Sequence, residues 1–132
     1  MKATELMIGD WVLMRGTPVQ VRAIGVNTIR YSDMLITEPL ENIEPILLTP
    51  DILTKNGFEH KHNHNEGWLS LEEYPNWSVD IKADETPYRL IADNSTGVAD
   101  IHDGIFVNKR INHVHELQHA LRLCNIEKEI IL

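Results

Sequence analysis

The chain has 132 residues, of which 20 are acidic and 12 are basic, so its formal net charge is −8. This length suits one domain or two very small ones. An acidic chain without a run of lysine or arginine repels phosphate backbones and anionic lipid surfaces, which disfavours nucleic-acid binding and membrane binding. The nearest basic pair, Lys109-Arg110, is too short to change that expectation.

Cysteine usage and the first residues indicate the compartment. The single cysteine, Cys124, cannot form an internal disulfide, which fits a reducing environment. Glu5 brings a negative charge close to the N-terminus and no long apolar core follows it, so we expect no signal peptide. No apolar run in the sequence is long enough to span a bilayer. Together these features predict a cytoplasmic protein.

Residues 1–48 consist of short apolar segments between turn signals. Gly9-Asp10, residues 15–18 and residues 25–27 have the composition of turns. Strands are expected between and after these turns, at residues 11–14, 19–24, 28–31 and 40–46, the last one interrupted by Pro45. Several short strands in so short a stretch predict a small SH3-like β-barrel in residues 1–48.

Residues 49–132 begin with a helix signal. Thr49 can cap a helix, Pro50 suits the first helical position, and Asn56-Gly57 can end the helix about two turns later. Further short strands are expected at residues 68–71, 77–81, 88–92 and 105–107, with another candidate at 98–101. Strands of this length, bounded by Pro, Gly, Asn or Asp, predict an antiparallel meander.

A second helix is expected over residues 113–124, with Asn112 as its cap. One apolar stripe recurs at helical spacing and would pack on the sheet, formed by Val114, Leu117, Leu121 and Cys124. Residues 127–132 are expected to form a short extended tail that could add a strand. The fold class is therefore α+β, with the barrel in residues 1–48. The connecting helix, antiparallel sheet and C-terminal helix occupy residues 49–132, as a second domain or as one compact unit with the barrel.

Three segments together resemble a known group of sequences: residues 6–12 (LMIGDWV), 48–58 (LTPDILTKNGF) and 114–121 (VHELQHAL). The chain resembles a group of small, uncharacterised proteins encoded in Bacteroidetes genomes, often in phage or prophage regions. The resemblance implies a mobile-element context and no activity, ligand or catalytic residue. Members of that group often end in a similar helix that lacks the second histidine, so the resemblance implies no role that depends on His119.

Residues 115–119 read HELQH and match HExxH, the pattern of zinc metalloproteases. In that chemistry His115 and His119 would bind one zinc ion, because side chains four positions apart share a helix face. Glu116 would activate the zinc-bound water. A small zinc-dependent hydrolase is therefore one functional hypothesis.

Three features of the sequence favour a coincidental match. A catalytic zinc needs a third protein ligand, but Arg122 and Asn125 occupy the positions where the extended pattern has glycine and histidine. On a helical wheel His115 and His119 lie opposite the apolar stripe, so they are expected to face solvent. A small, mostly-β chain also has little material for a substrate cleft. The segment is therefore interpreted as the polar face of a surface helix, with no cofactor.

Other histidines and the tryptophans offer weaker candidates. His60, His62 and His64 alternate, so on a strand they would share one face and could hold a metal, whereas a polar loop tip is the simpler interpretation. Tryptophan in a small β domain usually packs in the core, but an exposed ring can anchor a partner. The candidates for partner binding are Trp11, Trp68 and Trp77.

No nucleophile elbow, phosphate-binding loop or dinucleotide fingerprint is present in the sequence. Cys124 lies on the apolar stripe and is expected to behave as a small buried hydrophobe. The leading hypothesis is a non-enzymatic accessory or interaction protein of phage or prophage origin. It would bind a protein partner through the barrel surface.

Overall fold

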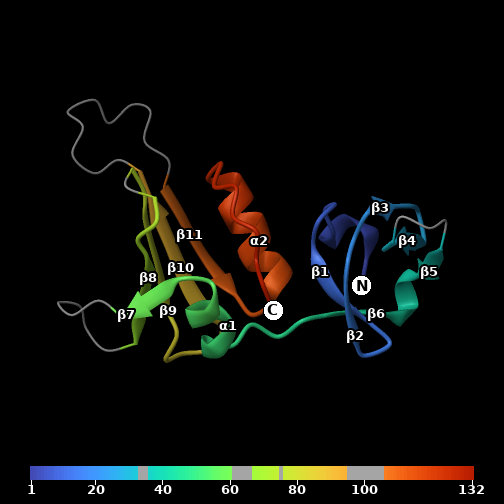
Figure 1. Ribbon diagram of the computed structural model, residues 1–132, viewed down its shortest axis with the longest axis horizontal. Helices are drawn as coiled ribbons and strands as arrows, with labels where there is room; N and C mark the ends of the chain where they lie inside the picture. Colours follow the sequence, from blue (N-terminus) through green and yellow to red (C-terminus); the bar gives the residue numbers. More distant parts are fainter. Residues whose placement is uncertain (33–35, 61–66, 75, 95–105) are drawn as a thin grey trace. The chain divides into compact units, whose positions relative to one another are not determined.

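The computed structural model describes residues 1–32, 36–60, 67–74, 76–94 and 106–132. The chain divides into two compact units, the first formed by Met1–Leu47 with His113–His119 and the second by Leu48–Asn112 with Ala120–Leu132. Antiparallel sheets with a C-terminal helix make up the described part, as the α+β prediction requires (Figure 1). None of its helices is long and apolar enough to cross a membrane. The division into separate domains after residue 48 stays a prediction.

Unit 1 contains six short strands in its described part: β1 (Trp11–Met14), β2 (Thr17–Gln20), β3 (Ala23–Ile24), β4 (Thr28–Arg30), β5 (Thr37–Pro39) and β6 (Ile43–Pro45). They form two three-stranded sheets, ordered β2-β1-β6 and β3-β4-β5, and neither sheet closes on itself. Two 3-10 helices, Ala3–Glu5 and Leu40–Asn42, flank them. β5 has no apolar alternation, which is why the sequence does not predict it.

The β1–β2 hairpin shows how local sequence builds unit 1. Arg15 and Gly16, with φ values of 51° and 84°, form the two-residue turn that matches the twist of paired strands. The turn sets Val12 opposite Val19 and directs Val12 into the core. Six buried side chains form that core: Leu6, Val12, Val21, Ile29, Leu40 and Ile43.

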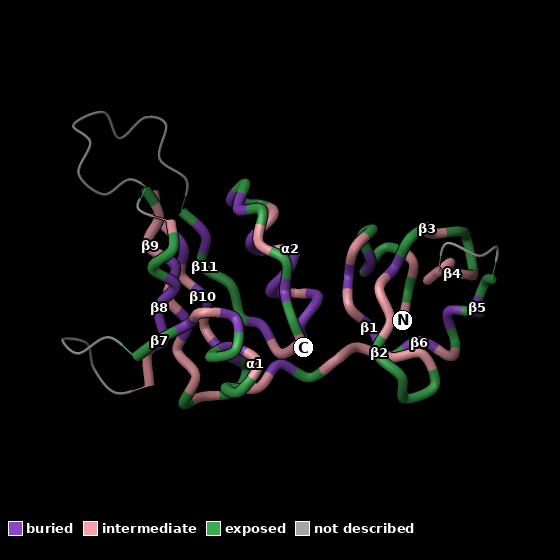
Figure 2. Tube along the Cα trace, in the orientation of Figure 1, coloured by how far each residue is buried: buried purple, intermediate pink, exposed green. Residues whose placement is uncertain are grey.

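Unit 2 starts with the predicted helix, α1 (Pro50–Lys55). The Thr49 hydroxyl accepts a hydrogen bond from the Ile52 amide at 3.2 Å, and Gly57 has a φ of 91° just after the helix end. Five strands follow: β7 (Phe58–His60), β8 (Trp68–Leu71), β9 (Ser78–Lys82), β10 (Tyr88–Asp93) and β11 (Phe106–Ile111). They pair in the order β11-β10-β9-β8-β7, which confirms the antiparallel meander. Burial alternates along β9 and β10 (Figure 2), so this sheet has one inner and one outer face.

The C-terminal helix, α2, spans Val114–Leu123, and the predicted stripe from Val114 to Cys124 is buried. Asn125, with a φ of 58°, ends the helix. The Ile126 amide donates to the Leu121 carbonyl at 2.9 Å, and the Asn125 amide donates to the Arg122 carbonyl at 3.0 Å. This double pattern is the Schellman motif, which satisfies the last carbonyls of a helix.

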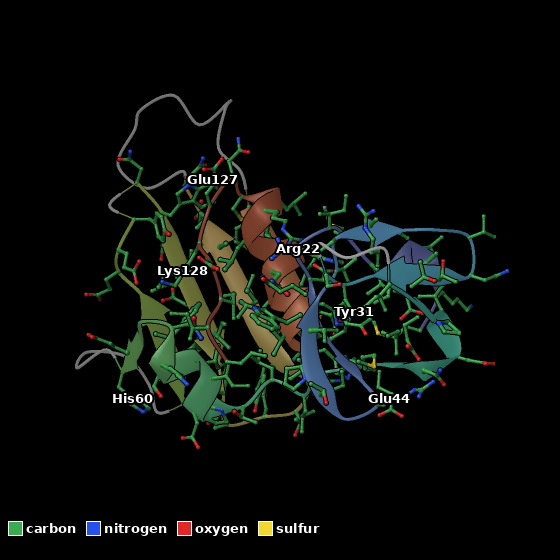
Figure 3. All side chains as sticks on the ribbon, turned by 45° about the vertical axis from the view of Figure 1, so that its right-hand side comes forward. Arg22, Tyr31, Glu44, His60, Glu127 and Lys128 are labelled. Atoms are coloured by element: carbon green, nitrogen blue, oxygen red, sulfur yellow. The ribbon has the colours of Figure 1, made fainter. Side chains whose placement is uncertain are left out.

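The C-terminal segment after α2 forms no strand, although the sequence allowed one. It is held in place by side chains instead. The Asn56 amide donates to the Ile131 carbonyl at 2.7 Å and accepts from the Ile131 amide at 2.7 Å, as a neighbouring strand's backbone would. Lys128 (Figure 3) pairs with Glu73 at 2.9 Å, and Ile130 is buried.

Candidate functional site at the start of helix α2

The HELQH segment lies in the first turns of α2, inside unit 1. The helix begins at Val114, so His113 occupies the cap position and the prediction of Asn112 as the cap is wrong. Glu116 explains the shift by one residue. Its Oε1 accepts a hydrogen bond from the His113 amide at 3.0 Å and lies 2.7 Å from His113 Nδ1. A glutamate three residues after the cap that reaches back to the cap amide is half of a capping box.

Gln118 joins α2 to the start of β1. Its side chain is 7% exposed. Its Oε1 accepts a hydrogen bond from the Trp11 amide at 2.9 Å, and its Nε2 donates to the Gly9 carbonyl at 3.0 Å. One buried side chain thus satisfies a donor and an acceptor of a backbone segment distant in the sequence, as buried backbone groups require.

His119 contacts the carboxylate of Asp10, a residue with no solvent exposure. His119 Nε2 lies 2.6 Å from Asp10 Oδ2, and the same oxygen accepts a hydrogen bond from the Met7 amide at 2.7 Å. The His119 side chain is 26% exposed. Asp10 therefore holds both its own turn and the helix, because a buried carboxylate must be paired.

His115 lies between two other imidazole rings and is 6% exposed. Its ring stacks on that of His113 with a centroid distance of 5.6 Å and meets that of His119 edge-on at 5.5 Å. Its Nδ1 is buried and has no hydrogen-bond partner in the described part of the chain. Burial lowers the pKa of His115, and this outweighs the opposing charges of Asp10 and Glu116. A neutral imidazole is therefore favoured.

The prediction that the histidine pair faces solvent is wrong for His115. A helical wheel shows only that one face is apolar and packs in a core. It does not show whether the opposite face meets water or a second layer of protein. In unit 1 the polar face packs on the turn before β1, and its buried members, His115 and Gln118, are polar.

These contacts limit the chemistry that the segment can perform. Zinc chemistry of the HExxH type needs both histidines on one metal and a free glutamate beside it. Glu116 instead contacts His113, and the His119 ring nitrogen contacts Asp10. Within the described ranges, no group of three or more His, Cys, Asp or Glu side chains is arranged to hold a metal ion. Cys124 is buried, and burial raises the pKa of its thiol, which disfavours a nucleophilic thiolate.

No protein-family model, curated protein or solved structure matches this chain in the three comparisons made with known proteins. The proposed function therefore rests on the contacts within the chain.

The other predicted candidates are dispersed. Trp11 lies on β1, Trp68 on β8 and Trp77 just before β9, and each is partly exposed. Their role in partner binding stays a prediction. His60 is exposed at the end of β7 (Figure 3), whereas His62 and His64 lie outside the described residues.

Sequence reasoning missed Asp10 and Gln118 as members of this cluster. The sequence predicts a turn at Gly9-Asp10, and the positive φ of Gly9, 92°, agrees with it. The sequence carries no signal that the Asp10 carboxylate would meet a histidine 109 positions later. A polar residue at the Gln118 position, next to an apolar stripe, was the one available hint of a second packed face.

Proposed function

We propose that this chain is a non-enzymatic accessory protein of phage or prophage origin that acts by binding a protein partner. The supporting observation is that three polar side chains of the HELQH segment, those of Glu116, Gln118 and His119, make hydrogen bonds or ion pairs inside unit 1. Glu116 contacts the helix cap, Gln118 contacts the backbone around β1, and His119 contacts Asp10. Residues that stabilise a fold in this way are used for packing, which supports a non-enzymatic role for the segment that carries the HExxH pattern.

The proposal includes a small SH3-like arrangement of the strands in residues 1–48, since short antiparallel strands around one apolar core are typical of such domains. The partly exposed Trp11 on β1 is the candidate anchor on that unit, and Trp68 and Trp77 are the candidates on unit 2. Aromatic anchors contribute a large share of binding energy at interfaces.

Affinity capture from phage-infected or prophage-carrying host lysate, followed by reconstitution with the purified candidate, tests the proposal. We expect a complex whose dissociation constant rises about tenfold or more when one of the three tryptophans is replaced by alanine. Circular dichroism would verify that each variant folds. A folded chain that reproducibly captures no partner would contradict the proposal.

Metal analysis of the untagged, chelator-treated protein supplies the opposing test. We expect no stoichiometric zinc and no hydrolysis of peptide or ester substrates. Zinc that is bound in the wild type, lost in His119→Ala and retained in Glu116→Gln, together with hydrolysis lost in Glu116→Gln, would replace the proposal with a zinc-dependent hydrolase.

A further inference from the structure

β11 is an edge strand of the five-stranded sheet. It pairs with β10 on one side, and within the described part of the chain no backbone hydrogen bond joins it to another segment on its other side. Its exposed side chains include Phe106, at 64%. Such an edge presents unpaired N–H and C=O groups to which a strand from another molecule can add.

The sheet register brings three cations together on the outer face. Lys82 of β9 lies opposite Arg89 of β10, and Arg89 lies opposite Arg110 of β11. We call Lys82, Arg89 and Arg110 the cationic row. Trp68 of β8 lies opposite Lys82 at one end of the row, and the other end of the row is the β11 edge. These residues come from three strands and meet only through the strand register, so composition and local charge do not show the row.

The cationic row is only partly neutralised. Like charges directly opposite each other destabilise a sheet. Glu85 Oε1 lies 2.7 Å from Arg110 Nη1, and this hydrogen bond, with the charges of the row, holds the pKa of the Glu85 carboxyl below its usual value. Across the residues that the structure describes, no carboxylate forms an ion pair with Lys82 or Arg89. Positive charge therefore remains beside a strand edge that is unpaired in the described part of the chain.

We propose that an extended acidic segment of a protein partner adds to β11 as a further antiparallel strand. Pairing in register sets one partner residue opposite Arg110 and the next opposite Lys109, on the two faces of the sheet. A carboxylate opposite Arg110 would continue the cationic row with an opposite charge, and a carboxylate opposite Lys109 would pair with that lysine on the other face. An apolar residue would lie opposite Phe106. This inference rests on the proposed function, because it names the chemistry of the partner.

The charge distribution favours a peptide over a nucleic acid. Asp80 and Asp93 share the outer face with the cationic row, and the whole chain carries a net charge of −8. These charges repel a densely charged phosphate backbone. A peptide strand, in contrast, can place single carboxylates beside Arg110. Within the described residues, Arg110 donates hydrogen bonds to Glu85 and to the Pro87 carbonyl, and both use Nη1. The other guanidinium N–H groups can then donate to a partner carboxylate.

The probe is a capped, dye-labelled hexapeptide with glutamates at the positions opposite Arg110 and Lys109 and valine opposite Phe106. Fluorescence anisotropy would measure its binding to the full-length protein, and amide chemical shifts would locate it. We expect saturable binding that weakens with salt, shifts centred on residues 106–111, and a roughly fivefold to tenfold loss of affinity in Arg110→Glu. A peptide with lysine opposite position 110 should restore binding to that variant.

Matched variants keep the test decisive. Arg22→Glu removes the same charge from an exposed position in unit 1 (Figure 3) and should leave affinity unchanged. If Arg110→Glu fails to fold, Lys109→Glu replaces it in the binding measurement. The Lys109 side chain is exposed and makes no ion pair in the described part of the chain, so this substitution should not disturb the fold. The same peptide with N-methylated backbone amides should not bind.

Several results would overturn this inference. They are no saturable binding, shifts outside β11, equal loss in Arg22→Glu, equal binding of the N-methylated peptide, or tighter binding of an oligonucleotide than of the acidic peptide. A protein partner that is captured equally well by wild type and Arg110→Glu would refute the β11 site while leaving the proposed function standing. A chain that binds the peptide but captures no cellular partner would count against the proposed function alone.

Discussion

His115 is a polar residue that is almost completely buried. Its Nδ1 lacks a partner within the described residues, and its ring contacts the rings of His113 and His119. Leaving a buried nitrogen unsatisfied costs stability, and a charged imidazole would cost more. The residue therefore makes folding sensitive to protonation.

Acidification should reduce stability through His115. Its folded pKa lies below the ordinary value of 6.5. The unfolded chain therefore binds a proton at His115 near that pH. The folded chain binds this proton only when the pH falls to the depressed pKa. The free energy of unfolding should be fully retained above pH 6.5 and should fall as the pH drops through that value toward the folded pKa. Urea unfolding between about pH 5 and 8 measures this slope.

The comparison variant for this prediction is His115→Leu. Its free energy of unfolding should change less steeply with pH than that of the wild type. At neutral pH its free energy of unfolding should lie no more than about 1.5 kcal/mol below the wild-type value. Asp10, Glu116, His113 and His119 surround the ring and remain in the variant. His60→Gln removes an exposed histidine and should leave the slope as it is. Equal slopes for the wild type and His115→Leu would contradict the prediction.

The pair formed by Asp10 and His119 should be strongly coupled. Asp10 is fully buried and also accepts from the Met7 amide, so its partners are not readily replaced by water. A double-mutant cycle with Asp10→Ala and His119→Ala should give a coupling of about 1–3 kcal/mol by urea unfolding. The control cycle is Arg15 with Glu38, where the arginine side chain is 69% exposed; its coupling should stay below about 1 kcal/mol. Similar couplings in the two cycles would refute the buried pair as an anchor.

At the level of elements, α2 is buried along its apolar stripe and also at two residues of its polar side. Leu117 and Leu121 are buried, and so are Gln118 and His115 on the polar side. A helix with both sides covered needs polar side chains that satisfy buried backbone groups, and Gln118 does this for two of them. Both ends of the helix are also capped by nearby residues. Glu116 accepts from the His113 amide at the start, and the turn at Asn125 caps the end.

Replacing Gln118 should loosen the start of β1. Gln118→Ala removes both hydrogen bonds and leaves the Trp11 amide without its acceptor, which should cost about 1–3 kcal/mol of unfolding free energy. Hydrogen exchange at the Trp11 amide should become faster by more than the global loss of stability accounts for. Gln20 donates to the same Gly9 carbonyl over a longer distance, 3.4 Å, so Gln20→Ala should have a smaller effect. Equal effects would show that the Gln118 contact is not an anchor.

At the level of the whole molecule, chain order and compact units do not coincide. Unit 1 is completed by residues 113–119, which come after all of the β strands. A segment that supplies hydrogen bonds to the β1 region cannot be removed without exposing the groups it satisfies. The N-terminal strands therefore depend on a distant part of the chain.

A fragment of residues 1–48 should fold poorly by itself. Without the start of α2, the Asp10 carboxylate loses His119, and the backbone around Trp11 loses Gln118. Amide spectra of the fragment should be poorly dispersed, and addition of a peptide covering residues 111–125 should sharpen and disperse them. A peptide with Gln118→Ala and His119→Ala should fail to do so. A fragment that is well folded without any added peptide would support an independent barrel instead.

Several elements could be predicted because their signals are local. The Thr49-Pro50 start and the Gly57 stop define α1, period-two apolar patterns define strands such as β9 and β10, and period-3.6 spacing defines α2. β5 could not be predicted, because Thr37–Pro39 pairs as a strand without an apolar pattern and buries Glu38 instead.

The sequence by itself determined the fold class, the two helices and the side of α2 that enters an apolar core. Those features depend on backbone propensity and on periodicity over a few neighbouring residues. Only the tertiary structure decided what the HELQH face contacts, and which cations meet on the sheet. Asp10 reaches His119 across 109 positions, and the cationic row depends on strand register. Contacts of that kind arise from packing between distant segments, which leaves no periodic trace in the chain.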